Sequence, residues 1–160
     1  MKKILMVLML ALRLGSLAGQ AADFVAGTGL EVQNPGRLRV LIERPTRDGE
    51  AIGLTYDKID LLVSQALRRS GIAPADVKDP NAGNQRLYVN INVLGPAYTI
   101  YLSLDRTVSF RVGDRTIFST GSSWNRSSLG THGGKAQFIL DALSGKIDSF
   151  ANLYLKANGR

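Results

Sequence analysis

The sequence predicts an α+β fold, a two-layer sandwich in which a four-stranded mixed sheet carries two helices on one face. Residues 86–124 contain three runs in which apolar and polar side chains alternate, a period typical of half-buried strands. Residues 55–71 and 135–157 instead place their apolar side chains at helical spacing. A further alternating run over residues 37–43 precedes the first helix. The predicted element order is therefore β-α-β-β-β-α, as in two-layer α+β domains.

The first strand and the first helix have clear limits. The strand over residues 37–43 is followed by a polar loop over residues 45–53. Thr55 is a good N-cap residue for the helix, and Gly71 is of the kind that ends helices. The polar residues 73–85 then read as a loop that leads to the next strand.

The middle of the chain predicts a three-stranded antiparallel meander. Its first strand covers residues 86–94. The second covers residues 97–112 as one long strand that bends at Asp105–Arg106, with a bulge or a break into two strands as the alternatives. Gly113–Asp114 is a two-residue hairpin signal. The third strand, residues 115–124, has a weaker pattern.

The C-terminal part predicts a loop and a long helix. Residues 125–134 are rich in Ser and Gly and read as a loop. The helix over residues 135–157 has its apolar side chains three or four residues apart, which suits one buried face. Gly145 in its middle costs about 1 kcal/mol relative to Ala and indicates a kink or a close helix crossing.

Residues 1–21 have the layout of a secretory signal peptide. Lys2 and Lys3 precede an apolar run over residues 4–12, and small residues follow up to Ala21. The apolar run is too short to span a membrane as a helix. We therefore expect cleavage after Ala21, a periplasmic location and no transmembrane segment in the mature chain.

The same region is similar to a bacterial lipoprotein signal. In Leu17-Ala18-Gly19-Gln20, Gln20 stands where such a signal has its lipidated cysteine, and the chain contains no Cys. The sequence leaves open whether Gln20 replaces a cysteine or is coincidental. The Gly-rich residues 22–36 are expected to form a flexible arm, and residues 37–160 a single α/β domain.

Charge and composition exclude several classes of protein. Removal of residues 1–21 takes away three bases and no acid, so 17 bases then face 13 acids and the formal net charge falls from +7 to +4. A charge of that size is ordinary for solubility, and we expect no nucleic-acid partner. The absence of Cys excludes disulfides, thiol catalysis and thiolate metal ligands.

The residues that could carry chemistry are few. His132 is the only His, and a lone His in a Gly-rich loop is usually a polar surface residue. No paired His or equivalent spacing predicts a metal site, and no Ser lies in a GxSxG context. The sequence thus predicts no catalytic residue, metal or cofactor, and His132 is retained as a binding candidate.

The outward-facing side of the meander is the main candidate binding surface. Polar and aromatic side chains of one strand should lie beside those of the next, on the face away from the core. Such a face is typical of recognition surfaces, and the alternative is a solvated sheet face with cross-strand pairs. The residues concerned are Tyr88, Asn90 and Asn92 on the first strand, and Thr99, Tyr101 and Ser103 on the second.

A second candidate lies at the end of the third strand. Alternation places Phe118, Thr120, Ser122 and Trp124 on one face of this strand, and Arg126 follows shortly after. Trp124 with Arg126 is a plausible contact pair, since both types are enriched in interfaces. Trp124 could equally cap the core, and this is the favoured interpretation.

Several short segments together resemble a family of uncharacterised secreted bacterial proteins with an α/β domain of unknown function. They lie between about Leu38 and Asn158 and comprise Leu54-Thr55, Ala66 to Ile72, Leu87 to Asn90, Ser123-Trp124 and Ile147 to Asn158. The resemblance implies export and an α/β fold, and brings no catalytic residues with it. The order of elements is also similar to small α/β modules of envelope assembly and transport proteins, an analogy of fold alone.

These observations favour a non-enzymatic interaction module of the bacterial cell envelope. It would bind an envelope protein or peptide through the open sheet face or an exposed strand edge, and a homodimer is an open possibility. The alternative is a small periplasmic hydrolase or a small-ligand carrier that uses the predicted loop over residues 121–135.

Overall fold

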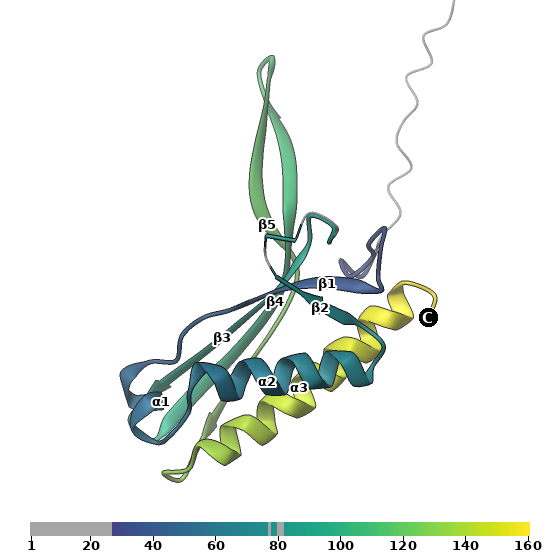
Figure 1. Cartoon of the computed structure of the whole chain (residues 1–160). Helices are drawn as coiled ribbons and strands as arrows, with labels where there is room; N and C mark the ends of the chain where they lie inside the picture. The colour runs from purple at the N-terminus through teal and green to yellow at the C-terminus, as the bar shows by residue number, and fades with distance from the viewer. Residues whose placement is uncertain (1–26, 77, 80–81) are drawn as a thin grey trace, which may run out of the picture.

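The computed structural model describes residues 27–76, 78–79 and 82–160 (Figure 1). The predicted signal peptide, residues 1–21, lies outside the described residues. The elements are β1 (Arg37–Ile42), α1 (Arg47–Ala51), α2 (Tyr56–Arg69), β2 (Ala73–Ala75), β3 (Arg86–Leu94), β4 (Ala97–Val112), β5 (Arg115–Thr131) and α3 (Ala136–Ala157).

The predicted α+β class and mixed sheet are confirmed, but the strand count is wrong. The sheet has five strands in the order β2-β1-β3-β4-β5. β1 pairs in parallel with both β2 and β3, and the remaining pairs are antiparallel. β2 and α1 fall in segments that the sequence predicts as polar loops. Both are too short for a periodic pattern, and β2 forms because its three residues pair with β1.

The limits of α2 agree closely with the prediction. The Thr55 hydroxyl accepts a hydrogen bond from the Lys58 backbone N–H at 3.3 Å, which caps the first turn. Gly71 ends the helix with φ +77°, a conformation that costs least for glycine. α2 and α3 lie side by side on one face of the sheet, and their buried side chains join those of β3 and β4 in one core (Figure 1).

β4 is one long strand, as predicted, but the irregularity lies one residue before the predicted bend at Asp105–Arg106, and its extra residue is on the neighbouring strand. The register with β5 shifts between Leu104 and Asp105, because Leu104 pairs with Trp124 whereas Asp105 pairs with Ser122. The extra residue is therefore Ser123, on β5. The prediction that Trp124 shares a face with Ser122 is wrong, because one inserted residue exchanges the two faces of a strand.

β5 is longer than predicted. It continues through residues 125–131, which pair with β4 up to Thr131 opposite Ala97. The predicted loop over residues 125–134 is thus wrong for all but residues 132–134. Ser and Gly carry little strand propensity, so the pairing with β4, and not the local sequence, makes this segment a strand.

Beyond the sheet, β4 and β5 continue alone as a projecting hairpin (Figure 1). β3 ends where Arg86 pairs with Asp105, so residues 106–112 and 115–121 form a two-stranded ribbon. At roughly 3.3 Å per residue the ribbon extends about 23 Å. The helices do not reach it, and four large apolar side chains of the ribbon are exposed: Val108, Phe110, Val112 and Phe118.

Part of the segment expected to be an arm lies against the body. Leu30 is buried in the core. The Asn158 side chain holds this segment by accepting from the Val32 N–H at 2.8 Å and donating to the Leu30 carbonyl at 3.0 Å. Arg106 donates to the Gly29 carbonyl at 2.7 Å, so the same segment packs at the base of the hairpin.

None of the helices in the described residues is long and apolar enough to cross a membrane.

Candidate functional site

The structure brings the predicted open-face residues together. Tyr88 pairs with Ser103, Asn90 with Tyr101 and Asn92 with Thr99, so the six side chains occupy three neighbouring positions on two strands. The core-facing side chains of β3 and β4 pack in the core with those of the helices, so this set lies on the opposite face of the sheet. Asn92 and Thr99 are exposed there, the tyrosines and Asn90 are partly buried, and Ser103 is buried.

Two tyrosines form the centre of this face. The rings of Tyr88 and Tyr101 meet edge to face, with centroids 6.1 Å apart and an interplanar angle of 66°. Asn92 Nδ2 donates to Asn90 Oδ1 at 2.6 Å. These contacts fix the side chains before any partner arrives, which lowers the entropy that binding must overcome. Burial, with a smaller effect of the Glu43 carboxylate, raises the pKa of Tyr88 above its ordinary value, so the phenol keeps its proton as a donor.

Trp124 and Arg126 lie on the other face of the sheet. The Trp124 indole is half-buried and packs against Phe150 of α3, with centroids 5.3 Å apart. The alternative that Trp124 caps the core is therefore what the structure has. Arg126 is exposed on the same side. The sequence offered this pair as a second candidate, apart from the tyrosines, and the bulge at Ser123 turns it to the helix side of the sheet.

His132 is buried, contrary to the expectation that it is a polar surface residue. Its Nε2 lies 2.7 Å from the Gly95 carbonyl oxygen, and its Nδ1 accepts from the Gly134 N–H at 3.0 Å. This pattern assigns the ring proton to Nε2. His132 also donates its backbone N–H to the Pro96 carbonyl at 3.1 Å. The two ring nitrogens thus join the turn at Gly95 to the turn at Gly134. These bonds explain why a histidine is buried at this position, without a bound ligand.

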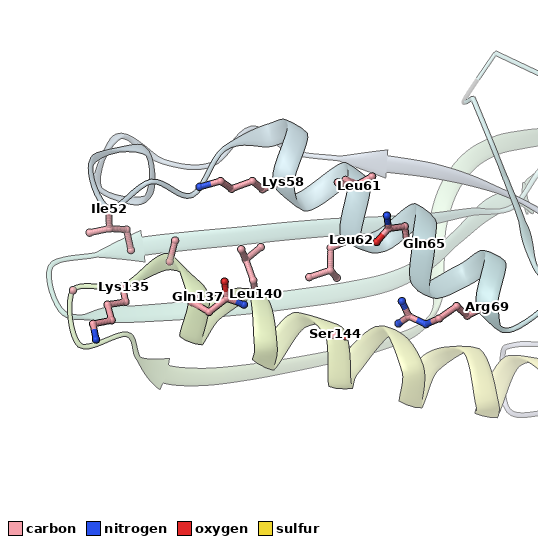
Figure 2. Close-up of a pocket in the computed structure, with 12 residues that line it drawn as sticks. Ile52, Lys58, Leu61, Leu62, Gln65, Arg69, Lys135, Gln137, Leu140 and Ser144 are labelled. Carbon is pink, nitrogen blue, oxygen red and sulfur yellow. The ribbon is translucent and has the colours of Figure 1, made fainter.

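The helices present a groove that the sequence did not reveal. It has a volume of about 760 Å³ and runs between α2 and α3 on the outer side (Figure 2). Lys58 and Lys135 lie at one end and Arg69 at the other, with Leu62 and Leu140 between them. Part of this charge is already engaged: Lys58 donates to the Gly53 carbonyl at 2.7 Å. The only sequence signal for the groove is Leu61, an exposed apolar residue on the outward side of α2.

A smaller pocket lies between β5 and α3. Its volume is about 210 Å³, and Trp124 and Phe150 form its apolar wall. Arg126 and Lys146 also line it, and Gly145 forms part of the helix side. The lining contains cations and no carboxylate. The mid-helix glycine was noted in the sequence as a kink or a crossing, but its place beside a pocket depends on the packing of α3 on β5.

The edge of the sheet at β5 is the third feature. Of the described strands, only β4 pairs with β5, so the other edge of its 17 residues is unpaired. The edge carries little of the usual protection, since β5 has no Pro, its charged residues are only Arg115 and Arg126, and the bulge at Ser123 is its one irregularity. The opposite edge of the sheet ends in β2, which has three residues.

The catalytic alternative receives no positive support from these features. The stretch over residues 121–131 that was expected to form a loop is strand, so it offers no loop scaffold for a site. In the part of the chain that the structure describes, no group of three or more His, Asp or Glu side chains could hold a metal ion. Comparison with protein-family models finds no match, and comparison with curated protein sequences also finds none.

Proposed function

We propose that this protein is a non-enzymatic interaction module of the bacterial cell envelope, which binds an extended segment of a partner protein by strand addition to β5. The observation that carries the proposal is the unpaired edge of β5. An edge of this length displays rows of free backbone N–H and C=O groups, and these are the groups that strand addition uses.

The projecting hairpin supports the same function. Phe110 is 50% exposed and Phe118 is 71% exposed, and their partners in the register show that they lie on opposite faces of the ribbon. An isolated two-stranded ribbon is marginally stable in water, and exposed clusters of large apolar side chains mark interaction sites. A partner that continues along β5 into the hairpin would cover both.

The open face adds a third contact region beside the edge. Ser127 and Leu129 of β5 pair with Tyr101 and Thr99, so a strand added to β5 extends the same surface. Leu129 is 75% exposed at this border. Rigid aromatic side chains such as the Tyr88–Tyr101 pair contribute contact area at low entropic cost. The export signal predicted in residues 1–21 is the reason to place the partner in the envelope.

The experiment is site-specific photo-crosslinking in living bacteria that export the full chain. The crosslinker replaces Leu129 at the border of β5, Phe118 on the hairpin or Tyr101 on the open face. Asp60, an exposed residue of α2, is the matched control position.

We expect a discrete heavier band from Leu129 and none from Asp60, with the partner identified by mass spectrometry. A band at twice the mass of the chain would make the partner a second copy and leave strand addition intact. Bands only from the helices, or none at any position while the protein is folded and exported, would contradict the proposal.

A further inference from the structure

We infer that the pocket between β5 and α3 receives an apolar side chain of the added strand, and that this side chain has acidic neighbours in the partner. The inference rests on the proposed strand addition to β5. It goes further by assigning a specificity pocket and the chemistry of the segment that fills it.

The pocket lies where an added strand would need one. A new strand pairs about 4.8 Å from β5, and every second side chain points to the helix side of the sheet. Trp124 and Arg126 occupy that side of β5 and line the pocket together with α3. In strand addition, backbone bonds supply affinity, and pockets for alternate side chains supply specificity.

The size of the pocket suits one large apolar side chain. Its volume of about 210 Å³ exceeds the cavity of about 150 Å³ that holds a benzene molecule in an engineered protein. Trp124 and Phe150 supply an aromatic wall. Helical spacing places four residues on one side of α3. The two small ones, Gly145 and Ser149, line the pocket, and the exposed apolar residues Phe138 and Leu153 lie before and after them.

Gly145 is the second line of argument. Glycine is among the least favourable residues in a helix interior. A Cβ at position 145 would meet no atom within 4 Å, so the packing of the chain itself does not require a glycine there. A partner side chain that enters the pocket would need the space beside position 145, and this need explains a glycine in the middle of the helix.

The charge of the lining defines the rest of the ligand. Arg126 and Lys146 line the pocket, and no acid does. In the described part of the chain neither side chain makes a hydrogen bond or an ion pair. Unpaired cations at an apolar pocket favour a segment with carboxylates two positions from its apolar anchor, where they share the anchor's face of the strand.

The test uses the full mature chain and a fluorescent peptide of about ten residues, a usual strand length. The probe alternates threonine and valine and has a central phenylalanine with a glutamate two positions away on either side, so that all three side chains point to the helix side. Binding is measured by fluorescence anisotropy. One control peptide replaces the phenylalanine by alanine, and another replaces the glutamates by lysines.

Gly145→Leu places a side chain in the pocket, and Gly145→Ala improves the helix without filling it. We expect Gly145→Leu to weaken probe binding at least about tenfold and Gly145→Ala to leave it within about twofold, while both variants melt at a higher temperature than the parent. The higher melting temperature shows that lost binding does not come from lost folding.

Arg126→Glu tests the charge separately. It should weaken binding of the glutamate probe and strengthen binding of the lysine peptide. Equal affinity of the parent and Gly145→Leu for the probe would overturn the inference, as would a parent that binds no probe. If Leu129 still crosslinks to a partner in either case, strand addition stands and only the assigned pocket fails.

Discussion

Replacement of Tyr154 by Phe should stabilise the protein, because the tyrosine hydroxyl is buried without a partner. Tyr154 is fully buried, and its ring packs on Phe150 with centroids 5.4 Å apart. Among the described residues no group forms a hydrogen bond with the hydroxyl oxygen. The substitution removes that oxygen and keeps the ring, so the aromatic packing on α3 is unchanged.

The magnitude follows from the cost of an unsatisfied hydroxyl and from its ionisation. A buried polar group without a partner costs about 1–3 kcal/mol. We expect the free energy of unfolding of Tyr154→Phe to be higher by roughly 1 kcal/mol near neutral pH. Burial raises the pKa of Tyr154 from 10.0 to about 12, against a smaller opposite effect of Arg106 and Arg160.

The sign of the pH dependence is fixed by this shift. The folded state holds the phenol proton more tightly than the unfolded state does. The ionisation of Tyr154 therefore costs no stability below pH 10, and the free energy of unfolding falls as the pH rises toward 12 because only the unfolded phenol ionises readily. Two pK units correspond to about 2.7 kcal/mol at the end of that range. The advantage of Tyr154→Phe should grow over the same interval.

The assay is urea unfolding followed by fluorescence of Trp124, the only Trp, at about pH 7 and about pH 11. Tyr56→Phe is the control, since Tyr56 is 39% exposed. A loss of stability above about 1 kcal/mol in Tyr154→Phe at neutral pH would refute the reasoning, because it would mean that the hydroxyl is bonded in the folded state.

Three further predictions concern the turns and the N-terminal segment. Gly29→Ala should lower the free energy of unfolding by at least about 2 kcal/mol, since φ is +81° and a Cβ would lie 1.9 Å from the Ser123 carbonyl oxygen. The control Gly113→Ala, where a Cβ would meet nothing within 4 Å, should cost about 1 kcal/mol. Equal losses of the two variants in urea unfolding would contradict the packing of the segment around Gly29. Hydrogen bonds from the backbone N–H groups of residues 28 and 29 contribute to lowering the pKa of Glu31 from 4.5 to about 2, so its contribution to stability is present above pH 4.5 and lost as the pH falls toward 2. Glu31→Gln should remove this part of the acid dependence, and an unchanged acid profile of unfolding would count against it. His132→Ala should cost about 2 kcal/mol because both ring hydrogen bonds are lost, yet it should leave crosslinking at the β5 edge intact.

Much of the fold could be predicted from alternation and from chain breakers. The buried residues of β3 are those of the apolar parity, Leu87, Val89, Ile91 and Val93. The break between β4 and β5 lies at Gly113–Asp114, as expected. These signals are local, since each depends on side chains within one strand or one turn.

The errors all depend on contacts between distant segments. β2 has three residues and exists because it pairs with β1. Residues 125–131 have loop-like composition and become strand by pairing with β4. A lone sequence contains no sign of either pairing, and propensity alone favours loops in both places.

The candidate site shows the same division. The register that places Asn90 opposite Tyr101 follows from alternation on both sides of a tight turn, and it could be predicted. Trp124 could not be placed, because the extra residue at Ser123 reverses its face. The buried position of His132 depends on Gly95, which is 37 residues away along the chain.

The most direct test of the account is hydrogen exchange of the β5 backbone amides, with and without the partner that Leu129 captures. Strand addition predicts slower exchange in the complex at alternate amides between Trp124 and Gly130, since alternate groups point to the unpaired edge. Amides of α2 that line the outer groove should keep their rates. Unchanged exchange along β5, with protection gained at α2 and α3 instead, would contradict the account and assign binding to the groove between the helices.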